Sequence, residues 1–311
     1  MTPPEGAAGG RVLVTGATGF VGHHLAARLL REGHDVHVVV RPQSQLGRLG
    51  SLRERLHLHV HDGTTRGLIA VMEAARPEVV FHLASRFLAT HQSDDVQGLI
   101  EDNLLFPTQL VEAAVRSGVL RLVNTGTSWQ HFESRPYDPV CLYAASKEAF
   151  EKLLAHYVNA SALRVVTLKL FDTYGPGDPR PKLFALLRRT ARTGEQLEMS
   201  PGAQVIDLCH VDDVVEAFVV AGQRLRAPGE PGMESFAVSG ERHTLRDLVE
   251  IFNQVSPRPA RIVWGGRPYR EREVMQPWST GTALPGWRPK VDLRSGMARL
   301  LADPDPAVSE K

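Results

Sequence analysis

Short apolar runs and longer amphipathic stretches alternate along the first half of the chain. Runs such as 12–14 and 79–83 are typical of buried strands, whereas the stretch from Leu25 to Leu30 is typical of a helix that buries one face. We expect strands at Arg11–Thr15, Asp35–Val40, Leu56–His61, Val79–Leu83, Arg121–Asn124 and Arg164–Leu170, with helices between them including Thr65–Ala75, Val96–Ser117 and Leu142–Asn159. This alternation predicts an α/β fold with a doubly wound parallel sheet.

The alternation breaks after Tyr174. Residues 175–181 are rich in glycine and proline and predict a loop, and shorter mixed elements follow. We therefore expect a larger domain over residues 1–174 and a smaller C-terminal, substrate-facing lobe over 175–204 and 222–311. Residues 205–221, with a helix over Asp212–Ala221, are expected to return to the larger domain.

A glycine-rich turn joins the first strand to the first helix. The segment Thr15–Gly22 reads TGATGFVG and follows the apolar residues 12–14. One glycine permits a sharp turn, one allows a pyrophosphate to approach the backbone, and Gly22 allows close packing of helix and strand. A glycine triad alone is often only a turn, but a strand before it and a helix after it indicate a dinucleotide-binding Rossmann domain. The predicted contacts to the cofactor come from Gly16, Thr18, Gly19, Phe20, Val21 and Gly22.

A tyrosine and a lysine four residues apart follow a later strand. Tyr143 and Lys147 fall on one face of a predicted helix, downstream of the hydroxyl residues Thr125, Thr127 and Ser128. A lysine ammonium there is expected to lower the pKa of the tyrosine and make its hydroxyl a workable acid or base. The alternative is a solvated lysine beside a half-buried tyrosine. The position after a strand and a hydroxyl cluster favours the catalytic interpretation.

Together these motifs resemble the extended short-chain dehydrogenase/reductase family, and within it the nucleotide-sugar epimerases, dehydratases and ketoreductases. Further fragments resemble those of the family and follow in the same order along the chain. They are 62–63, 81–84, Asn103, 171–176 and 210–214. The resemblance implies that Tyr143 transfers the proton, that Lys147 bonds the nicotinamide ribose, and that Thr127 or Ser128 polarises the carbonyl. It also implies cofactor contacts from Asp62, Gly63, Leu83, Ala84, Ser85, Asn103, Thr125, Tyr143, Lys147 and Phe171.

The end of the second predicted strand bears on cofactor choice. Where relatives that prefer NAD place an acidic residue, this chain has Arg41 after three valines. An arginine there can clamp a 2′-phosphate, which favours NADP(H) over NAD, and Ser44 and Arg48 are expected to add contacts. The alternative is a surface arginine on a loop.

The residues after Thr127 bear on the reaction. The family's dehydratases carry an acid pair there, whereas this chain has Ser128, Trp129 and Gln130. The segment resembles the CDP-abequose-type synthases, which are NADPH-dependent 4-ketoreductases. The leading hypothesis is therefore NADPH-dependent reduction of the 4-keto group of a nucleotide-linked 6-deoxy sugar. The alternatives are an NAD-dependent nucleotide-sugar 4-epimerase and a non-catalytic NADP(H)-binding regulator, against which the Tyr143–Lys147 pair speaks. The nucleotide, the sugar and the stereochemistry stay open.

The predicted substrate site departs from the family pattern at two positions. Ile206 stands where the family usually has an arginine, and Asp172 stands where it has an asparagine. Nearby basic residues are expected to supply the missing positive charge, although the stretch 267–272 has the alternative of a solvated loop. The predicted substrate contacts are Ser85, Thr127, Ser128, Trp129, Tyr143, Asp172, Arg180, Lys182, Arg267 and Arg270, with Arg272 as a further source of charge.

Composition excludes several other classes. The net charge is +1, which gives no indication of a nucleic-acid partner or a membrane surface, and no apolar run approaches the length of a membrane span. Residues 1–10 lack a basic region, so we expect a loose tail rather than a signal peptide, and a polar tail over 303–311. Cys141 and Cys209 build neither a disulfide framework nor a zinc site, and we expect no metal. Without a disulfide framework or a signal peptide, the expected location is cytoplasmic. A homodimer is also expected, because helices 96–117 and 142–159 resemble the family's dimer faces.

Overall fold

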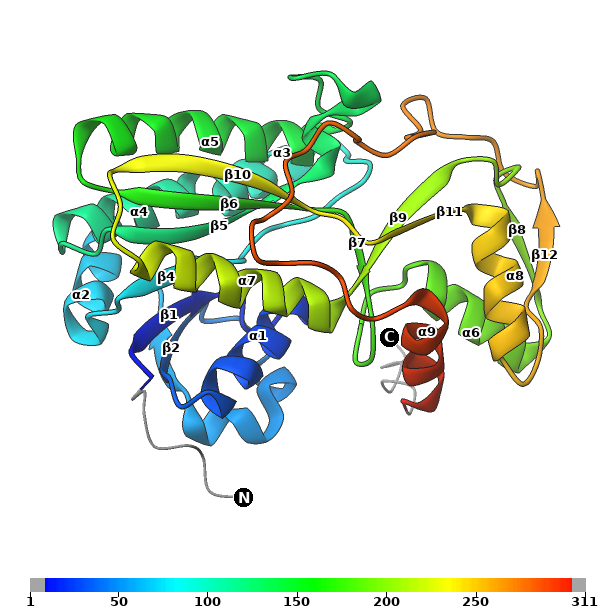
Figure 1. The fold of residues 1–311 in the computed structure, drawn as a ribbon, viewed down its shortest axis with the longest axis horizontal. Coiled ribbons are helices and arrows are strands. Elements are labelled where there is room, and N and C mark those ends of the chain that lie inside the picture. The colour runs from blue at the N-terminus through cyan, green and yellow to red at the C-terminus, as the bar shows by residue number, and fades with distance from the viewer. Residues whose placement is uncertain (1–8, 304–311) are drawn as a thin grey trace.

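The computed structural model describes residues 9–303, and a seven-stranded sheet dominates its larger part (Figure 1). The strand order is β10-β6-β5-β4-β1-β2-β3, and every neighbouring pair is parallel. The strands are β1 (Arg11–Thr15), β2 (Asp35–Val40), β3 (His57–Val60), β4 (Val79–His82), β5 (Arg121–Thr127), β6 (Arg164–Leu170) and β10 (Gly232–Val238). The predicted doubly wound parallel sheet is confirmed.

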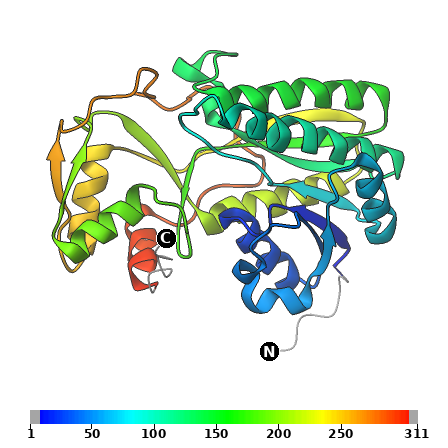
Figure 2. The same cartoon turned by 180° about the vertical axis from the view of Figure 1, so that it is seen from behind.

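Helices cover both faces of this sheet, as Figures 1 and 2 show. One face carries α1 (Phe20–Arg31) and α7 (Val211–Arg226), and the other carries α2 (Thr65–Ala75), α4 (Phe106–Arg116) and α5 (Leu142–Ala160). In β1, Val12 and Val14 join the apolar cluster under α1 and α7, whereas Leu13 joins the cluster under α2 and α4. Successive side chains of a strand point to opposite faces, so both faces of a buried parallel sheet must be apolar.

The helix predicted over Val96–Ser117 is present, but a π turn interrupts its α-helical geometry. The segment forms α3 (Asp95–Ile100), a wide π turn (Glu101–Leu105) and then α4. Pro107 lies at the start of α4 and has no N–H to donate to the preceding turn. A helix widens where such a bond is missing, which turns the side chain of Asn103 inward.

A smaller lobe lies beside the carboxyl end of the large sheet and has its own core (Figure 1). Leu187, Phe252 and Met297 are fully buried within it. Its strands are β7 (Asp172–Tyr174), β9 (Val205–His210) and β11 (Glu241–Thr244) in one sheet, and β8 (Gln196–Met199) and β12 (Arg261–Trp264) in another. Its helices are α6 (Leu183–Thr193), α8 (Leu245–Val255) and α9 (Leu293–Ala302). Short 3-10 turns occupy Leu46–Arg55, Ser128–Gln130 and Phe132–Ser134.

The boundaries between the two lobes differ from the predicted ones at three strands. Helix α7 packs on the large sheet as expected. Strand β10, however, lies in the segment predicted for the smaller lobe, yet it pairs along the whole of β6. Strands β7 and β9, predicted for the larger domain, pair with each other in the small sheet. Pairing with β10 removes an exposed edge from β6, which no local pattern records. The functional division into cofactor and substrate lobes stays a prediction.

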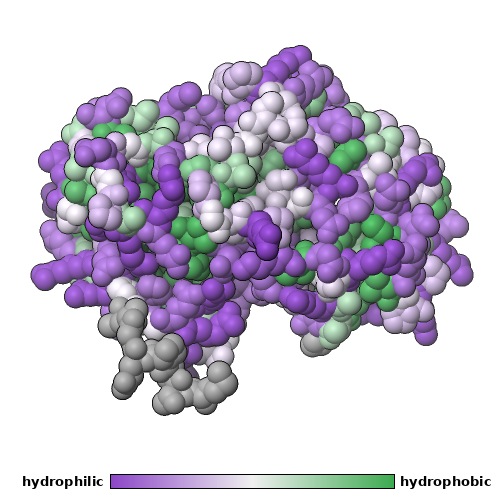
Figure 3. Space-filling model, in the orientation of Figure 1, coloured by the Kyte–Doolittle hydropathy of each residue, from purple (hydrophilic) through white to green (hydrophobic). Residues whose placement is uncertain are grey.

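Hydrophilic residues cover most of the face shown in Figure 3, with small apolar areas between them. Within residues 9–303 no helix combines the length and the apolar character that crossing a membrane requires. The two predicted tails, over 1–10 and 303–311, fall almost entirely outside the described residues.

Candidate active site

The site forms where the strand order reverses, between β1 and β4. The chain leaves β1 toward β2 and β3 on one side, and later builds β4, β5 and β6 on the other. Thr15 ties the two strand ends together, because its Oγ1 accepts hydrogen bonds of 3.2 Å from the backbone N–H groups of Leu83 and Ala84. Ligands of open parallel sheets bind in the crevice that such a reversal leaves at the carboxyl ends of the strands.

The glycine turn lies at this crevice and has no room for side chains. Gly16 adopts a φ of +77°, and a Cβ atom there would lie 2.6 Å from the backbone nitrogen of Ala84. A Cβ atom on Gly22 would lie 2.1 Å from the carbonyl oxygen of Gly16, so helix and turn touch backbone to backbone. The steric role predicted for Gly22 is therefore confirmed.

The same turn leaves the start of α1 open to an anion. Gly19 caps α1 without a side-chain hydrogen bond, and the first turn holds no acidic residue. The N–H groups of Phe20, Val21 and Gly22 consequently lack intrahelical partners, and the helix dipole adds partial positive charge. Thr18 is half-buried and Gly19 exposed beside them. These features fit the diphosphate of a dinucleotide.

A group of charged residues lies beyond the ends of β2 and β3. Arg41 follows β2, and its Nη1 donates to both carboxylate oxygens of Asp102, at 3.0 and 3.2 Å. Its backbone N–H donates to Ser44 Oγ at 2.9 Å. Asp62 is exposed beyond β3, and hydrogen bonds from Thr64 hold its carboxylate and lower its pKa. Arg41 is thus accessible, with its side chain 53% exposed, but already paired.

Tyr143 and Lys147 lie in the first two turns of α5, as the spacing predicts, and both are buried. The exposed Phe87 packs edge-on against the Tyr143 ring at 5.0 Å between centroids. Burial raises the pKa of Tyr143 to about 12, although hydrogen bonding with Ser85 and Thr127 opposes the rise. Burial also lowers the pKa of Lys147 to about 8, opposed by the charge of Glu151.

The expectation that Lys147 lowers the pKa of Tyr143 is wrong for this structure. Desolvation penalises the phenolate, and this penalty outweighs the attraction of any nearby cation. The phenol therefore keeps its proton at neutral pH, which is the form that a proton donor requires.

Asn103 supports the site from behind instead of facing the crevice. Its Oδ1 accepts from Ser85 Oγ at 2.9 Å and from the Arg86 N–H at 2.8 Å, and its Nδ2 donates to the Arg86 carbonyl and to Ser146 Oγ. These four bonds use the capacity of a carboxamide. The predicted cofactor contact of Asn103 is therefore replaced by a positioning role for the loop after β4. Thr125 is similarly engaged, donating to the His82 carbonyl at 2.7 Å.

A buried polar network under Thr127 is the main feature that the sequence analysis missed. The Thr127 N–H donates to Gln130 Oε1 at 2.9 Å, and Gln130 Nε2 donates to Glu148 and Glu151 at 2.6 and 2.9 Å. Lys169 completes the network, 3.4 Å from Glu151. Hydrogen bonding and the Lys169 charge lower the pKa of Glu148 despite burial, whereas burial raises that of Glu151. One sequence pattern could have indicated this network: Glu151 follows Lys147 by four residues, so both lie on the same buried face of α5.

A cavity of about 140 Å³ adjoins this network on the side of the smaller lobe. Phe171, Asp172 and Ser128 line it, together with Trp129, Arg270, Gln204 and Trp278. The Trp278 ring stacks on His131 at 4.2 Å, and His131 Nε2 lies 2.7 Å from Lys169 Nζ. The structure thus gathers predicted substrate residues around one space with aromatic and polar walls, as ligand pockets generally have.

The predicted basic residues are distributed unevenly around this cavity. Lys182 lies 3.2 Å from Asp172, Arg180 pairs with Asp178 at 2.7 Å, and Arg270 pairs with Glu273 at 2.9 Å. Arg272 pairs with Asp138, away from the cavity lining. Arg267 is exposed and does not line the cavity. Carboxylates already neutralise most of this positive charge, so the expected surplus is smaller than the sequence suggests.

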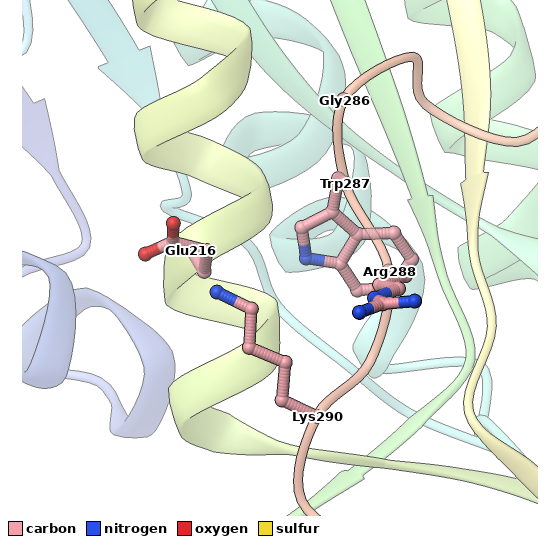
Figure 4. A pocket seen from close by; sticks show the side chains of 5 residues that line it. All are labelled: Glu216, Gly286, Trp287, Arg288 and Lys290. Carbon is pink, nitrogen blue, oxygen red and sulfur yellow. The ribbon is translucent and has the colours of Figure 1, made fainter.

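A second cavity, of about 310 Å³, is larger but lies elsewhere (Figure 4). It separates α7 from the segment 286–290, and Lys290 points toward Glu216 across it. The segment is docked on α7 by a hydrogen bond of 2.9 Å from Trp287 Nε1 to the Asp213 carbonyl. None of the predicted site residues lines this second cavity. Ser128, Trp129, Asp172 and Arg270 line the smaller cavity, which is therefore the better substrate site, although Tyr143 and Thr127 do not themselves line it.

Comparisons with known proteins give matches that cover most of the chain. The family described as the NAD dependent epimerase/dehydratase family matches residues 12–234. A protein named UDP-glucose 4-epimerase from Mycolicibacterium smegmatis is 30% identical, covering 94% of this chain and 97% of its own. A CDP-abequose synthase from Yersinia pseudotuberculosis is 25% identical over 86% of this chain and 91% of its own. The crystal structure of Thermus thermophilus UDP-glucose 4-epimerase with NAD is 26% identical, with a TM-score of 0.78 over 94% of this chain and 98% of that one.

Proposed function

Because this chain belongs to the NAD dependent epimerase/dehydratase family, we propose that it carries out nicotinamide-dependent redox chemistry at C4 of a nucleotide-linked sugar. More narrowly, we propose NADPH-dependent reduction of a 4-keto group, in a 6-deoxy sugar. The observation that carries this choice is Arg41 at the end of β2, where a 2′-phosphate of the adenosine ribose would lie. An arginine suits a phosphate because it offers several N–H donors and a permanent charge.

The cofactor would be held along the carboxyl edge of β1 to β4. The open start of α1 and the glycine turn suit its diphosphate, Arg41 and Ser44 suit the ribose phosphate, and Asp62 suits the adenine end. The chemistry that the nicotinamide supplies is hydride donation to the keto carbon. Lys147, buried beside Tyr143 on α5, would bond the nicotinamide ribose.

Tyr143 is the proton donor in this proposal. Burial keeps its hydroxyl protonated at neutral pH, so the phenol can donate to the carbonyl oxygen as negative charge develops there. Thr127 and Ser128 are buried next to the cavity, and either hydroxyl can polarise the carbonyl. Gln130 holds the backbone of Thr127, and the loop that bears Ser85 is held by Asn103.

The substrate would occupy the cavity lined by Phe171, Trp129 and Trp278. Aromatic walls suit the ring faces of a base or a sugar, and Arg270, over the Trp129 ring at 5.3 Å, is close enough to meet a diphosphate. Lys182 pairs with Asp172 of the lining, whereas Arg180 pairs with Asp178 and lies over the Phe20 ring, and neither basic side chain lines the cavity.

A second candidate is an NAD-dependent 4-epimerase, and the relative that favours it is the M. smegmatis protein of that name. An epimerase returns hydride to the carbon it came from and needs no net cofactor. The discriminating experiment incubates purified protein with NADPH or NADH and a panel of 4-keto and 4-hydroxy sugar nucleotides, and follows absorbance at 340 nm beside product chromatography. Stoichiometric NADPH consumption with a 4-keto substrate supports the reductase. Conversion of a 4-hydroxy substrate into its epimer without NADPH consumption overturns it.

We also propose that the protein is a homodimer that pairs through α4, α5 and the turn before α4. Leu105 and Leu153 are 52% and 38% exposed on these neighbouring elements, which is unusual for large aliphatic side chains unless a partner covers them. Light scattering after size exclusion measures the mass directly. We expect twice the chain mass, and a Leu105→Lys/Leu153→Lys variant at the mass of one chain.

A further inference from the structure

Four polar side chains gather where β2 and β3 begin, at the edge opposite the proposed cofactor site. Strands β2 and β3 are parallel, with His37 in register with His57. Asp35, His37, His57 and His59 are alternate residues of their strands, so all four side chains project from one face of the sheet. Neither the cofactor site nor the substrate cavity uses any of them.

Three of these side chains, Asp35, His37 and His57, bring their polar atoms close together. His57 Nε2 lies 2.9 Å from Asp35 Oδ1, and His37 Nε2 lies 3.5 Å from Asp35 Oδ2. The three ligand atoms lie within 4.8 Å of one another. Ligands at 2.0–2.1 Å from a tetrahedral ion are roughly 3.4 Å apart. The His37 and His57 rings stack at 4.6 Å between centroids, so the exposed His57 ring would have to tilt toward His37 for both nitrogens to hold one ion.

The buried member of the group has a ring nitrogen with no hydrogen bond. The His37 side chain is 9% exposed, and its Nε2 has no hydrogen-bond partner. Its other nitrogen, Nδ1, lies 2.9 Å from His59 Nε2. If Nδ1 carries the proton and donates it to His59, the lone pair of His37 Nε2 points toward Asp35. Histidines that bind metals almost always have their second nitrogen held in this way.

We propose that Asp35, His37 and His57 form a binding site for a divalent transition-metal ion such as Zn²⁺, with His59 orienting His37. Two imidazoles and one carboxylate make a donor set that suits Zn²⁺ and disfavours the harder Mg²⁺ and Ca²⁺. The fourth position is left to water.

The position of the site indicates a structural role. An ion there would clamp β3, the outermost strand of the large sheet, to β2. The clamped ends are the amino ends of both strands, whereas Arg41 and Asp62 follow their carboxyl ends. The ion would therefore stabilise the fold without contacting cofactor or substrate. The two cysteines led to the expectation of no metal, whereas the local pattern that bears on this site is the alternating histidines at 57 and 59.

The test uses the full chain without a histidine tag, first stripped of metal. Zn²⁺ is titrated by calorimetry, and Co²⁺ binding is followed by its visible absorption. His57→Ala removes an exposed imidazole and Asp35→Asn neutralises an exposed carboxylate, so the core stays intact. His156→Ala, an exposed histidine on α5, is the matched control.

We expect one equivalent bound by the wild type and by His156→Ala, with Tm raised by Zn²⁺ in both. In His57→Ala and Asp35→Asn we expect the affinity for Zn²⁺ to be at least about tenfold weaker than in the wild type. We also expect Zn²⁺ to raise the Tm of these variants by less. Absence of binding in the wild type overturns the proposal. So does equal affinity in His57→Ala and the wild type, because the ion would then lie elsewhere.

Discussion

Arg41 and Asp102 form a two-point ion pair beyond the end of β2, with Arg41 Nη1 3.0 and 3.2 Å from the two carboxylate oxygens. Arg86 Nε contacts the same carboxylate at 2.9 Å. Asp102 thus gathers two guanidinium groups at the place proposed for the ribose phosphate. A phosphate with two negative charges competes for these donors more strongly than one carboxylate does.

Replacing Arg41 by alanine should weaken NADPH binding by about 1.5–3 kcal/mol, the usual worth of charged hydrogen bonds, and leave NADH binding nearly unchanged. Fluorescence titration with each cofactor measures both affinities. Arg31→Ala, an exposed arginine in the last turn of α1, is the control and should change neither. The complementary variant Asp102→Asn releases Arg41 and should strengthen NADPH binding about two- to fivefold. Equal NADPH affinity in Arg41→Ala and the wild type would refute the phosphate clamp.

Replacing Tyr143 by phenylalanine should lower kcat by about 10²–10⁴, because the reaction loses its positioned proton donor. Cofactor affinity should stay close to that of the wild type, since the ring and its contact with Phe87 are retained. Steady-state rates and cofactor titration test the two halves separately. Near-normal turnover of this variant on the true substrate would remove Tyr143 from the mechanism.

The fall of kcat/KM at alkaline pH should follow the deprotonation of Lys147. Burial lowers its pKa to about 8, so the ammonium form is present below that pH and is lost as the pH rises through it. We expect kcat/KM to fall with an apparent pKa near 8, because the free enzyme's essential groups set this profile. Lys147→Ala should weaken both cofactor binding and rate, and any activity of Lys147→Arg should lack the fall near pH 8. A wild-type profile that is flat to pH 9.5 would contradict this assignment.

Gly22→Ala should disrupt the cofactor site and the fold together. The new Cβ would meet the Gly16 carbonyl at 2.1 Å, and overpacking of this kind costs about 1–3 kcal/mol. Gly47→Ala adds the same atom where nothing lies within 4 Å and serves as the control. Thermal unfolding and cofactor titration should both separate the two variants. If both variants bind cofactor equally well, the turn does not carry the diphosphate.

Lys169→Met should destabilise the protein by about 3–5 kcal/mol, because Glu148 and Glu151 would lose the buried lysine that pairs with both of them. Adding Glu151→Gln to this variant should recover part of the loss. Lys152→Met removes an exposed lysine that pairs with the same Glu148, and it should change stability by less than about 1 kcal/mol. Urea unfolding measures all three. Equal losses for Lys169→Met and Lys152→Met would show that the buried network contributes little.

Features that depend on neighbours along the chain could be predicted from the residues alone. Apolar periodicity decides which residues face a helix or a second layer, so the order of strands and helices and the parallel sheet could be predicted. The glycine turn before α1 and the spacing of Tyr143 and Lys147 are local as well, because one helical turn brings residues i and i+4 to one face.

Features that depend on distant segments became visible only in the folded chain. The pKa of Tyr143 is raised because several elements together exclude water from it, which no spacing encodes. Arg41 meets Asp102 across 61 positions, and Lys169 meets Glu151 from a different element. Strand β10 enters the large sheet because β6 has a free edge there. Periodicity specifies that a side chain is buried, but its partners and its desolvation follow from how the chain packs.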